Sequence, residues 1–163
     1  MKNKNMKYPD TRAFKFAVDY LNRINVTFRD IAEICKMNQE KYSNKDLDYY
    51  ENTVVRVLHK REVLNHLMVM AFLDDADKGG FLPSPLNDII HNDMGCFGVD
   101  ESLALGGSQI FGSIAITNYS YIDKTKKKKI GELDSSNGAT TFADDIVGMI
   151  CACVIAHSVH ELA

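Results

Sequence analysis

Two acidic doublets are the residues of this sequence best suited to chemistry: Asp100-Glu101 and Asp144-Asp145. Each opens a stretch that is otherwise apolar and rich in small residues, so we expect each to begin a helix. If the two helix starts meet, four carboxylates converge in a poorly hydrated region, where repulsion and burial raise their pKa values unless a cation lies between them. Mg²⁺ prefers hard oxygen ligands and keeps positions for waters and phosphate oxygens. The doublets therefore predict a magnesium site.

A purely structural role explains two of the four acids. Thr141 and Asp144 have the spacing of a capping box, and Asp100 can serve as an N-cap, because the helix dipole favours acids in a first turn. Neither explanation requires an acid at Glu101 or Asp145, which at helical spacing share faces with small residues that let another helix approach closely. The functional hypothesis depends mainly on these two residues. The small residues are Ala104, Ser108, Gly112 and Ala115 beside Glu101, and Gly148, Ala152 and Ala156 beside Asp145.

Two further patterns resemble metal sites. His59, Glu62 and His66 share one face of an expected helix and could bind a transition metal, but a di-iron bundle needs such a motif on two helices and the sequence has no second copy. Structural or surface roles explain these residues as well. Asp75 to Gly79 begins like a calcium loop, but the third acidic ligand is missing and the final bidentate position falls on Leu86. We therefore predict no calcium loop.

The bulk composition limits the class of protein. The 163 residues are 45% hydrophobic and 25% charged, which suits one sizeable core, so we expect a single domain over residues 1–163 with a flexible tail at 1–10. A net charge of −3 argues against a nucleic-acid binder, which normally carries a basic excess. The four cysteines include no CxxC pair and the N-terminus has no apolar signal region. These features favour a cytoplasmic protein that meets any membrane substrate at the inner surface.

The spacing of apolar residues predicts an all-α fold of about six helices packed around a central apolar helix at the C-terminus. The last helix is apolar on nearly every face, which is typical of a helix buried at the centre of its domain. A basic, exposed loop is expected at Lys126–Lys129. The expected helical segments are Thr11–Arg23, a helix opened by a capping box at Thr27–Asp30, one long helix from Asp46 to Ala76, Leu86–Ile90, Asp100 to Ile116 or beyond, and Thr140 or Thr141 to His160.

Four stretches of the chain resemble the phosphatidylglycerophosphatase A family, and from Thr11 to the C-terminus the chain is similar to a soluble, all-helical bacterial branch that includes low-temperature-requirement C protein. The resemblance places the family's Asp-Glu and Asp-Asp motifs on the two doublets and its later motif Asp on Asp123. It implies magnesium-dependent removal of the phosphomonoester from phosphatidylglycerophosphate, giving phosphatidylglycerol, with an anionic phospholipid headgroup as partner. The stretches are GVDESLAL (98–105), FGSI (111–114), YIDK (121–124) and TFADDIVG (141–148).

The chain departs from the membrane-embedded members of that family. It has Ser120 where they carry an Arg and Lys124-Thr125 where they carry a Lys-Pro turn. It also lacks their Gly/Pro-rich N-terminal motif and their hydrophobic spans. Without that Arg the substrate phosphate needs another cation, and Lys124, Lys126 and Lys127 are the nearest candidates.

The leading hypothesis assigns catalytic roles to Asp123 and Asp145. Mg²⁺ held by the two doublets would neutralise the phosphate and activate a water, and Asp123 would orient that water or a basic partner. Two alternatives stay open: a non-catalytic metal- or lipid-binding regulatory protein of membrane adaptation, and a phosphatase for a soluble phosphate ester. Peripheral contact with a membrane and assembly into a homo-oligomer are also compatible with the sequence.

Overall fold

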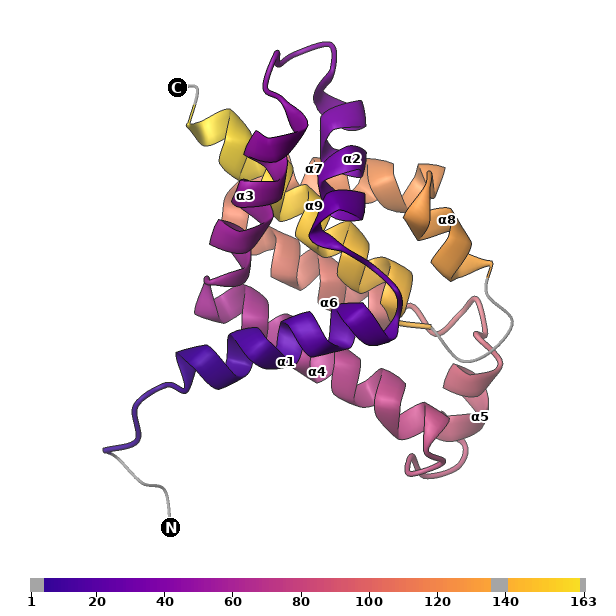
Figure 1. The fold of residues 1–163 in the computed structure, drawn as a ribbon. Coiled ribbons are helices and arrows are strands. Elements are labelled where there is room, and N and C mark those ends of the chain that lie inside the picture. Colours follow the sequence, from indigo (N-terminus) through magenta and orange to yellow (C-terminus); the bar gives the residue numbers. More distant parts are fainter. Residues whose placement is uncertain (1–4, 136–140, 162–163) are drawn as a thin grey trace.

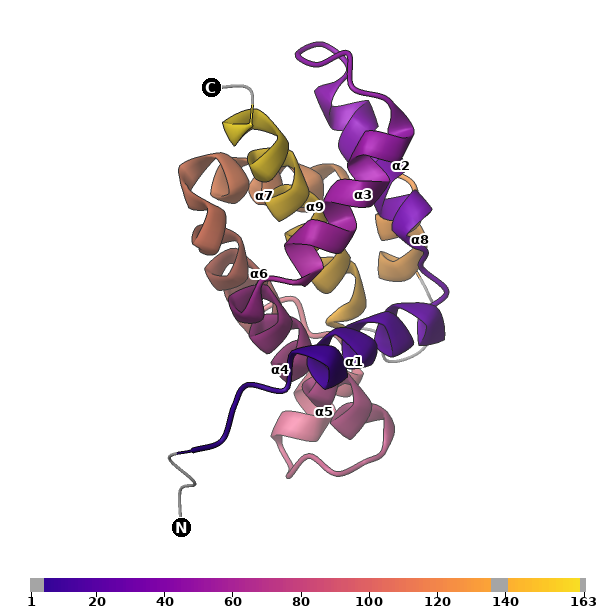
Figure 2. The same cartoon turned by 60° about the vertical axis from the view of Figure 1, so that its left-hand side comes forward.

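The chain folds into helices that surround one central helix. The computed structural model describes residues 5–135 and 141–161, and these residues form nine α-helices, one 3₁₀ turn and no strand. The all-α prediction is confirmed, and so is the central position of the C-terminal helix, which runs through the middle of both views (Figures 1 and 2). The helices are α1 (Asp10–Arg23), α2 (Phe28–Gln39), α3 (Leu47–Leu58), α4 (Arg61–Lys78), α5 (Leu86–His91), α6 (Val99–Ser108), α7 (Gly112–Thr125), α8 (Lys129–Asp134) and α9 (Ala143–His160), with the 3₁₀ turn η1 at Gln109–Phe111.

Helix α9 forms the core. Every residue from Ala143 to Ala156 is buried, and α9 packs against α2, α3, α4, α6, α7 and α8. Each fully buried Ile or Val contributes roughly 1.5–3 kcal/mol of transfer free energy, so this helix supplies much of the hydrophobic stabilisation. Among the described helices α9 alone is long and apolar enough to cross a membrane, but 83% of its length is buried inside the protein. Its apolar faces are therefore covered by other helices of the same chain.

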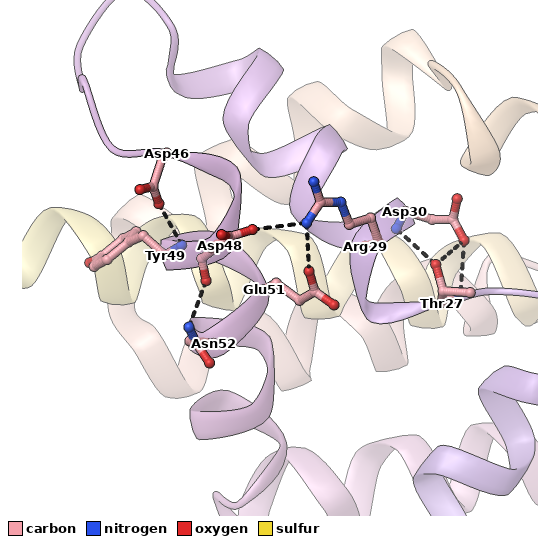
Figure 3. Close-up of polar contacts among 8 residues, drawn as sticks. All are labelled: Thr27, Arg29, Asp30, Asp46, Asp48, Tyr49, Glu51 and Asn52. Atoms are coloured by element: carbon pink, nitrogen blue, oxygen red, sulfur yellow. Dashed lines mark hydrogen bonds and ion pairs between the residues drawn. The ribbon is translucent and has the colours of Figure 1, made fainter.

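Helices α2 and α3 both begin at side-chain caps. Thr27 Oγ1 accepts a hydrogen bond from the Asp30 amide at 3.1 Å, and Asp30 Oδ2 accepts one from the Thr27 amide at 2.7 Å, which confirms the predicted capping box (Figure 3). Asp46 caps α3 by accepting a hydrogen bond from the Tyr49 amide at 2.8 Å. Such caps stabilise a helix by about 1 kcal/mol each and fix where it starts.

A surface arginine links the first turns of these two helices. Arg29 of α2 lies between Asp48 and Glu51 of α3, at 2.9 Å and 3.1 Å from their carboxylate oxygens (Figure 3). All three side chains are more than a third exposed, so solvent screens the attraction and the bridge sets alignment more than stability.

The expected long helix from Asp46 to Ala76 is wrong, because the chain breaks at His59-Lys60 into α3 and α4. The Lys60 backbone is extended, with ψ of 117°. Neither Gly nor Pro marks the break, but the hydrophobic stripe changes phase there: after Val57 and Leu58 an unbroken helix would bury positions 61 and 62, which are Arg and Glu. Burial resumes instead at Val63 and Leu64. The turn lets α3 and α4 cover different parts of α9.

The expected continuous helix from Asp100 to Ile116 is also interrupted. Helix α6 ends at Ser108, η1 follows, and α7 starts at Gly112, whose φ of +78° favours glycine. Gly112 therefore turns the chain rather than lining the face of Glu101. These two breaks, together with α8, account for the larger number of helices than expected.

The start of α9 differs from its prediction. The N-cap is Phe142 and no side chain caps the helix, so the predicted capping box of Thr141 and Asp144 is absent. The Thr141 hydroxyl instead donates to the Ile90 carbonyl of α5 at 2.8 Å, which ties the start of α9 to another helix. Thr140, the alternative predicted start, and residues 1–4 of the predicted tail lie outside the described residues.

Candidate active site

The first acidic doublet lies in the first turn of α6. The N-cap is Gly98 in the left-handed region with φ of 57°, a conformation that suits glycine, so Asp100 is not the N-cap. Asp100 is 6% exposed and its Oδ1 has no hydrogen-bond partner. Burial raises the pKa of Asp100 to about 8, with contributions from the Glu101 hydrogen bond and from the charge of Asp145. The hydrogen bond with Asp100 holds the pKa of Glu101 below its usual value.

The second doublet contains a buried acid bound by a tyrosine. Asp145 is 3% exposed, and the Tyr119 hydroxyl of α7 donates to its Oδ1 at 2.5 Å. Burial raises the pKa of Asp145 to about 7, helped by the charges of Asp144 and Glu101 and opposed by Tyr119 and Lys126. Burial and the charge of Asp145 raise the pKa of Tyr119 in turn. Tyr119 therefore holds Asp145 in one orientation.

Small residues allow the three helices that carry these side chains to approach closely. A Cβ on Gly148 of α9 would lie 3.4 Å from the ring of Tyr119, and a Cβ on Gly107 of α6 would lie 2.1 Å from Met149 Sδ. Helix α9 packs on both α6 and α7. The expected meeting of the two helix starts is thus present: the charge of Asp145 raises the pKa of Asp100, and the charge of Glu101 raises the pKa of Asp145.

The other acid of the second doublet belongs to a separate cluster. Lys126 Nζ lies 2.6 Å from Asp144, 3.0 Å from Asp134 and 3.2 Å from Asp123. Although burial lowers the pKa of Lys126, its hydrogen bond and charge interaction with Asp144, joined by the other two acids, raise it overall. Burial raises the pKa of Asp144, and Lys126 opposes that rise. The ammonium group occupies the cationic position beside Asp144, so the four acids form two neighbouring groups instead of one.

An open groove of about 460 Å³ lies between α6 and α7, next to the acidic residues. Glu101, Tyr119, Asp123 and Lys124 all line it, so two predicted site acids and one predicted substrate-binding lysine share one opening. Lys124 is exposed and, within the part of the chain that the structure describes, forms no ion pair. It is the cation of this groove that is free to meet an anion. The remaining lining residues are Ser102, Leu105 and Ser120.

The other lysines of the predicted basic loop point elsewhere. Lys127 donates to the Tyr121 hydroxyl at 3.3 Å and lines a different groove of about 760 Å³ on the other side of α7. Lys128 pairs with Glu33 at 3.0 Å, and Lys129 starts α8 and pairs with Glu132 at 2.9 Å. The prediction that Lys126–Lys129 form a solvated loop therefore fails for Lys126 and Lys129, which neighbouring acids hold in place.

The donor atoms suit a divalent cation in their chemistry. Asp100, Glu101 and Asp145 offer hard carboxylate oxygens, and Asp100 Oδ1 is buried without a partner, which is costly for a polar atom unless something binds it. As the side chains lie, however, no three His, Cys, Asp or Glu residues of the described chain are grouped as ligands of one ion. The fit to Mg²⁺ thus rests on donor type, burial and mutual charge. His59 and His66 are separated by the helix break, and each ring donates a hydrogen bond to a backbone carbonyl of its own helix, His59 to Val55 and His66 to Glu62.

Two residues of this region escaped prediction. The acidic motifs do not predict a role for Tyr119, although it lies one turn before Asp123 on the same face of a helix, a spacing that could indicate it. Asp134 also belongs to this region, and no local sequence pattern connects it to Lys126. Gly131 explains the approach of this segment: a Cβ there would lie 2.3 Å from the Lys126 carbonyl oxygen. Only a glycine lets α8 pack against the turn that carries Lys126.

The model of the family Phosphatidylglycerophosphatase A matches residues 26–160, which include every residue of the site. This chain belongs to the phosphatidylglycerophosphatase A family. Membership in the phosphatidylglycerophosphatase A family indicates a phosphatase of that type. The resemblance of the chain to this family is thereby confirmed.

Similar proteins occur in Bacillus subtilis and Listeria monocytogenes. Uncharacterized protein YpjQ of Bacillus subtilis is 37% identical over 161 residues, covering 96% of this chain and 91% of that protein, and uncharacterized protein YutG of the same organism is 42% identical over 140 residues, covering 83% and 84%. The crystal structure of YpjQ has a TM-score of 0.88 at 36% identity, covering 96% of this chain and all of the other. The low temperature requirement C protein of Listeria monocytogenes has a TM-score of 0.87 at 38% identity, covering 92% and 96%.

Proposed function

We propose that this protein is a magnesium-dependent phosphomonoesterase that converts phosphatidylglycerophosphate to phosphatidylglycerol. The observation that carries the proposal is the meeting of Asp100, Glu101 and Asp145 at the starts of α6 and α9, with a partnerless buried oxygen on Asp100, beside an open groove. The match to the family supports this choice of reaction and of lipid substrate.

The acids would have different roles, which follow from their different surroundings. Asp100, Glu101 and Asp145 would hold the ion, and Tyr119 would keep Asp145 in its binding orientation through the 2.5 Å hydrogen bond. When bound, Mg²⁺ would supply positive charge to the phosphate oxygens and lower the pKa of a water. Asp144 lies beside Lys126 and would act on the site through its charge.

Asp123 is placed to handle the proton of the attacking water. It lines the groove, its side chain is partly exposed, and Lys126 Nζ lies 3.2 Å from its Oδ1. As the water oxygen bonds to phosphorus and the P–O bond to the glycerol carbon chain breaks, Asp123 would accept the water proton and the leaving alkoxide would take a proton from solvent. Lys124, which lines the same groove, would bind the phosphate.

The lysines supply only part of the charge that a phosphate dianion needs. Lys126 is occupied by three carboxylates, and Lys127 lines the other groove. Lys124 is then the one predicted substrate-binding lysine on this groove, which supports a reaction that depends on a metal ion for charge neutralisation. A position at the membrane surface would bring the groove to lipid headgroups.

Phosphate release from phosphatidylglycerophosphate in mixed micelles tests the proposal. The purified full chain should release inorganic phosphate and phosphatidylglycerol with Mg²⁺ and lose this activity with chelator. Asp145→Asn should lower kcat by at least about 10²-fold while the far-UV spectrum is retained. Glu132→Gln, an exposed acid paired with Lys129, is the matched control and should keep full activity. Absence of phosphatidylglycerophosphate turnover, whether or not membranes are added, would exclude the proposal.

The same experiment separates the alternatives. Cleavage of glycerol 3-phosphate at a rate equal to that of the lipid would identify a soluble phosphate ester as the substrate class. A Mg²⁺-dependent rise in melting temperature that Asp145→Asn removes, without cleavage of any phosphomonoester, would identify a metal-binding regulatory protein. The regulatory protein is supported by the pairing of Lys126 with three acids, which leaves this lysine unable to bind a substrate phosphate.

A further inference from the structure

Another buried acid, far from the groove in sequence, has no hydrogen-bond partner. Asp77 lies in the last turn of α4, its side chain is 1% exposed, and neither carboxylate oxygen has a hydrogen-bond partner. The negative end of the helix dipole makes this an unfavourable place for an anion. The nearby ammonium of Lys78 is taken by Asp74 at 2.7 Å. A buried carboxylate in such surroundings calls for a cation.

Helix α5, which packs against α4 near its end (Figure 1), presents two further donors. Asn87 and His91 are four residues apart and so share one face of α5. His91 Nδ1 lies 3.5 Å from Asp77 Oδ2, which places that face toward α4. Asn87 Oδ1 is buried and, like both oxygens of Asp77, has no partner among the described residues.

The distance between His91 and Asp77 has the value expected for two ligands of one ion. Two donor atoms that each lie about 2.1 Å from a metal are about 3.0–3.5 Å apart in octahedral or tetrahedral geometry. At 3.5 Å the two atoms make no hydrogen bond in this structure. The ring nitrogen and the carboxylate are therefore near each other without satisfying each other.

We propose that Asp77, Asn87 and His91 form a binding site for a divalent first-row transition-metal ion, such as Zn²⁺ or Mn²⁺. A carboxylate, an amide oxygen and an imidazole nitrogen together suit these ions better than Mg²⁺ or Ca²⁺, which take oxygen ligands alone. His91 is 59% exposed, so the site opens to solvent and waters complete the coordination. The ligands come from two helices, and of the three only Asp77 belongs to the Asp75–Gly79 stretch, whose calcium-loop pattern is incomplete.

The metal would hold α5 against α4, and α5 in turn is bonded to the segment that precedes α9. Ile90, next to His91, accepts the hydrogen bond of Thr141, which directly precedes the turn into α9. Asp144 and Asp145 follow within that helix. The proposed ion is structural, is distinct from the Mg²⁺ of the groove, and does not depend on the proposed phosphatase activity.

Isothermal titration of the full chain with Zn²⁺ and with Mn²⁺ tests this site. The exposed thiol of Cys96 is replaced in all samples by Cys96→Ser, since a free thiolate binds Zn²⁺. One bound ion should be lost in Asp77→Asn and should bind at least about tenfold more weakly in His91→Ala. Asp145→Asn should retain it, and Asp88→Asn, an exposed acid of α5 bound by Ser84, should bind as tightly as the parent.

The folding of the variants is checked by metal-free melting. Asp77→Asn removes a buried unpaired charge and should melt at or above the temperature of the parent, whereas the rise in melting temperature with Zn²⁺ should disappear. His91 is mostly exposed, so His91→Ala gives a second test that leaves the core intact. Equal metal binding by the parent, Asp77→Asn and His91→Ala, or loss of all binding in Asp145→Asn alone, would overturn the proposal.

Discussion

The Tyr119 hydroxyl of α7 and Oδ1 of Asp145 on α9 are joined by a 2.5 Å hydrogen bond that is buried from solvent. The bond crosses the most extensive helix contact of the fold, that between α7 and α9. It favours the ionised form of Asp145 against the burial that raises its pKa. One phenol thus controls both the orientation and the charge of the central acid of the site.

Tyr119→Phe should weaken Mg²⁺ binding by about 10–100-fold, the usual effect of removing a group that orients a metal ligand. Without the hydroxyl, Asp145 turns more freely and holds its proton to higher pH. The measurement is the Mg²⁺ concentration that gives half of the maximal rate or of the maximal rise in melting temperature. Tyr121→Phe, on the same helix but exposed, should leave both unchanged, and an equal effect of the two substitutions would contradict the role of Tyr119.

Lys126→Met should destabilise the protein by about 2 kcal/mol, because it leaves Asp144 buried without its cation. Urea unfolding measures this loss. Lys128→Met removes a surface pair in which both side chains are over 40% exposed, so it should change the free energy of unfolding by less than about 0.5 kcal/mol. The double variant Lys126→Met, Asp144→Asn should recover part of the loss, since the uncompensated charge is gone.

Stability without divalent ions should fall as the pH rises from about 4 to about 8. The pKa values of Asp100 and Asp145 are raised to about 8 and about 7, above the unfolded value of about 3.9. In this window the folded chain binds more protons than the unfolded chain, so the free energy of unfolding decreases with pH. Melting curves in chelator should show a shallower decrease for Asp100→Asn, and Mg²⁺ should stabilise the parent more at about pH 8 than at about pH 5. A pH-independent effect of Mg²⁺ would argue against binding at these acids.

Lys124→Gln should lower kcat/KM for the phosphomonoester about tenfold, equal to about 1.4 kcal/mol, without a change in melting temperature. Lys124 lines the acidic groove and is exposed, so its removal affects substrate and not the fold. Lys127→Gln is the matched change in the other groove. If Lys127→Gln had the larger effect, the substrate would approach from the other side of α7.

Gly131→Ala should destabilise the protein by about 1–3 kcal/mol, since the new methyl group would overlap the Lys126 carbonyl. Helix α8 would have to move, and Lys126 with it, so activity should fall together with the melting temperature. Gly95→Ala, where a Cβ meets nothing within 4 Å, should leave both measurements near those of the parent.

The sequence predicts the fold class well because the amphipathic spacing and the apolar last helix are local signals. The break at Lys60 lies where no Gly or Pro stands and depends on which faces of α3 and α4 cover α9, so a scan for helix breakers misses it. The change of phase between Leu58 and Val63 was available as a signal. Periodicity alone therefore predicts which segments are helical more reliably than where each helix begins and ends.

The sequence predicts which acidic residues belong to the site, but not which of them lie together. Glu101 and Asp145 were identified from small residues on their helix faces, and the structure brings their helices together. The pairing of Asp144 with Lys126 depends on a turn in which Lys126 and Lys128 both have positive φ. The run of four lysines in the sequence predicts a solvated loop and does not indicate this pairing. Tertiary ion pairs between residues eighteen apart, such as these two, leave no periodic trace in a sequence.

The central position of α9 has a consequence for biosynthesis. All the other helices within residues 5–135 and 141–161 precede it in the chain, yet most of them pack against it. While the ribosome makes the first eight, their apolar faces have no core to cover, and the chain must remain open or held by a chaperone until α9 emerges. Folding of this domain is then a late, largely concerted event, and truncations before α9 are expected to aggregate rather than to yield a smaller folded unit.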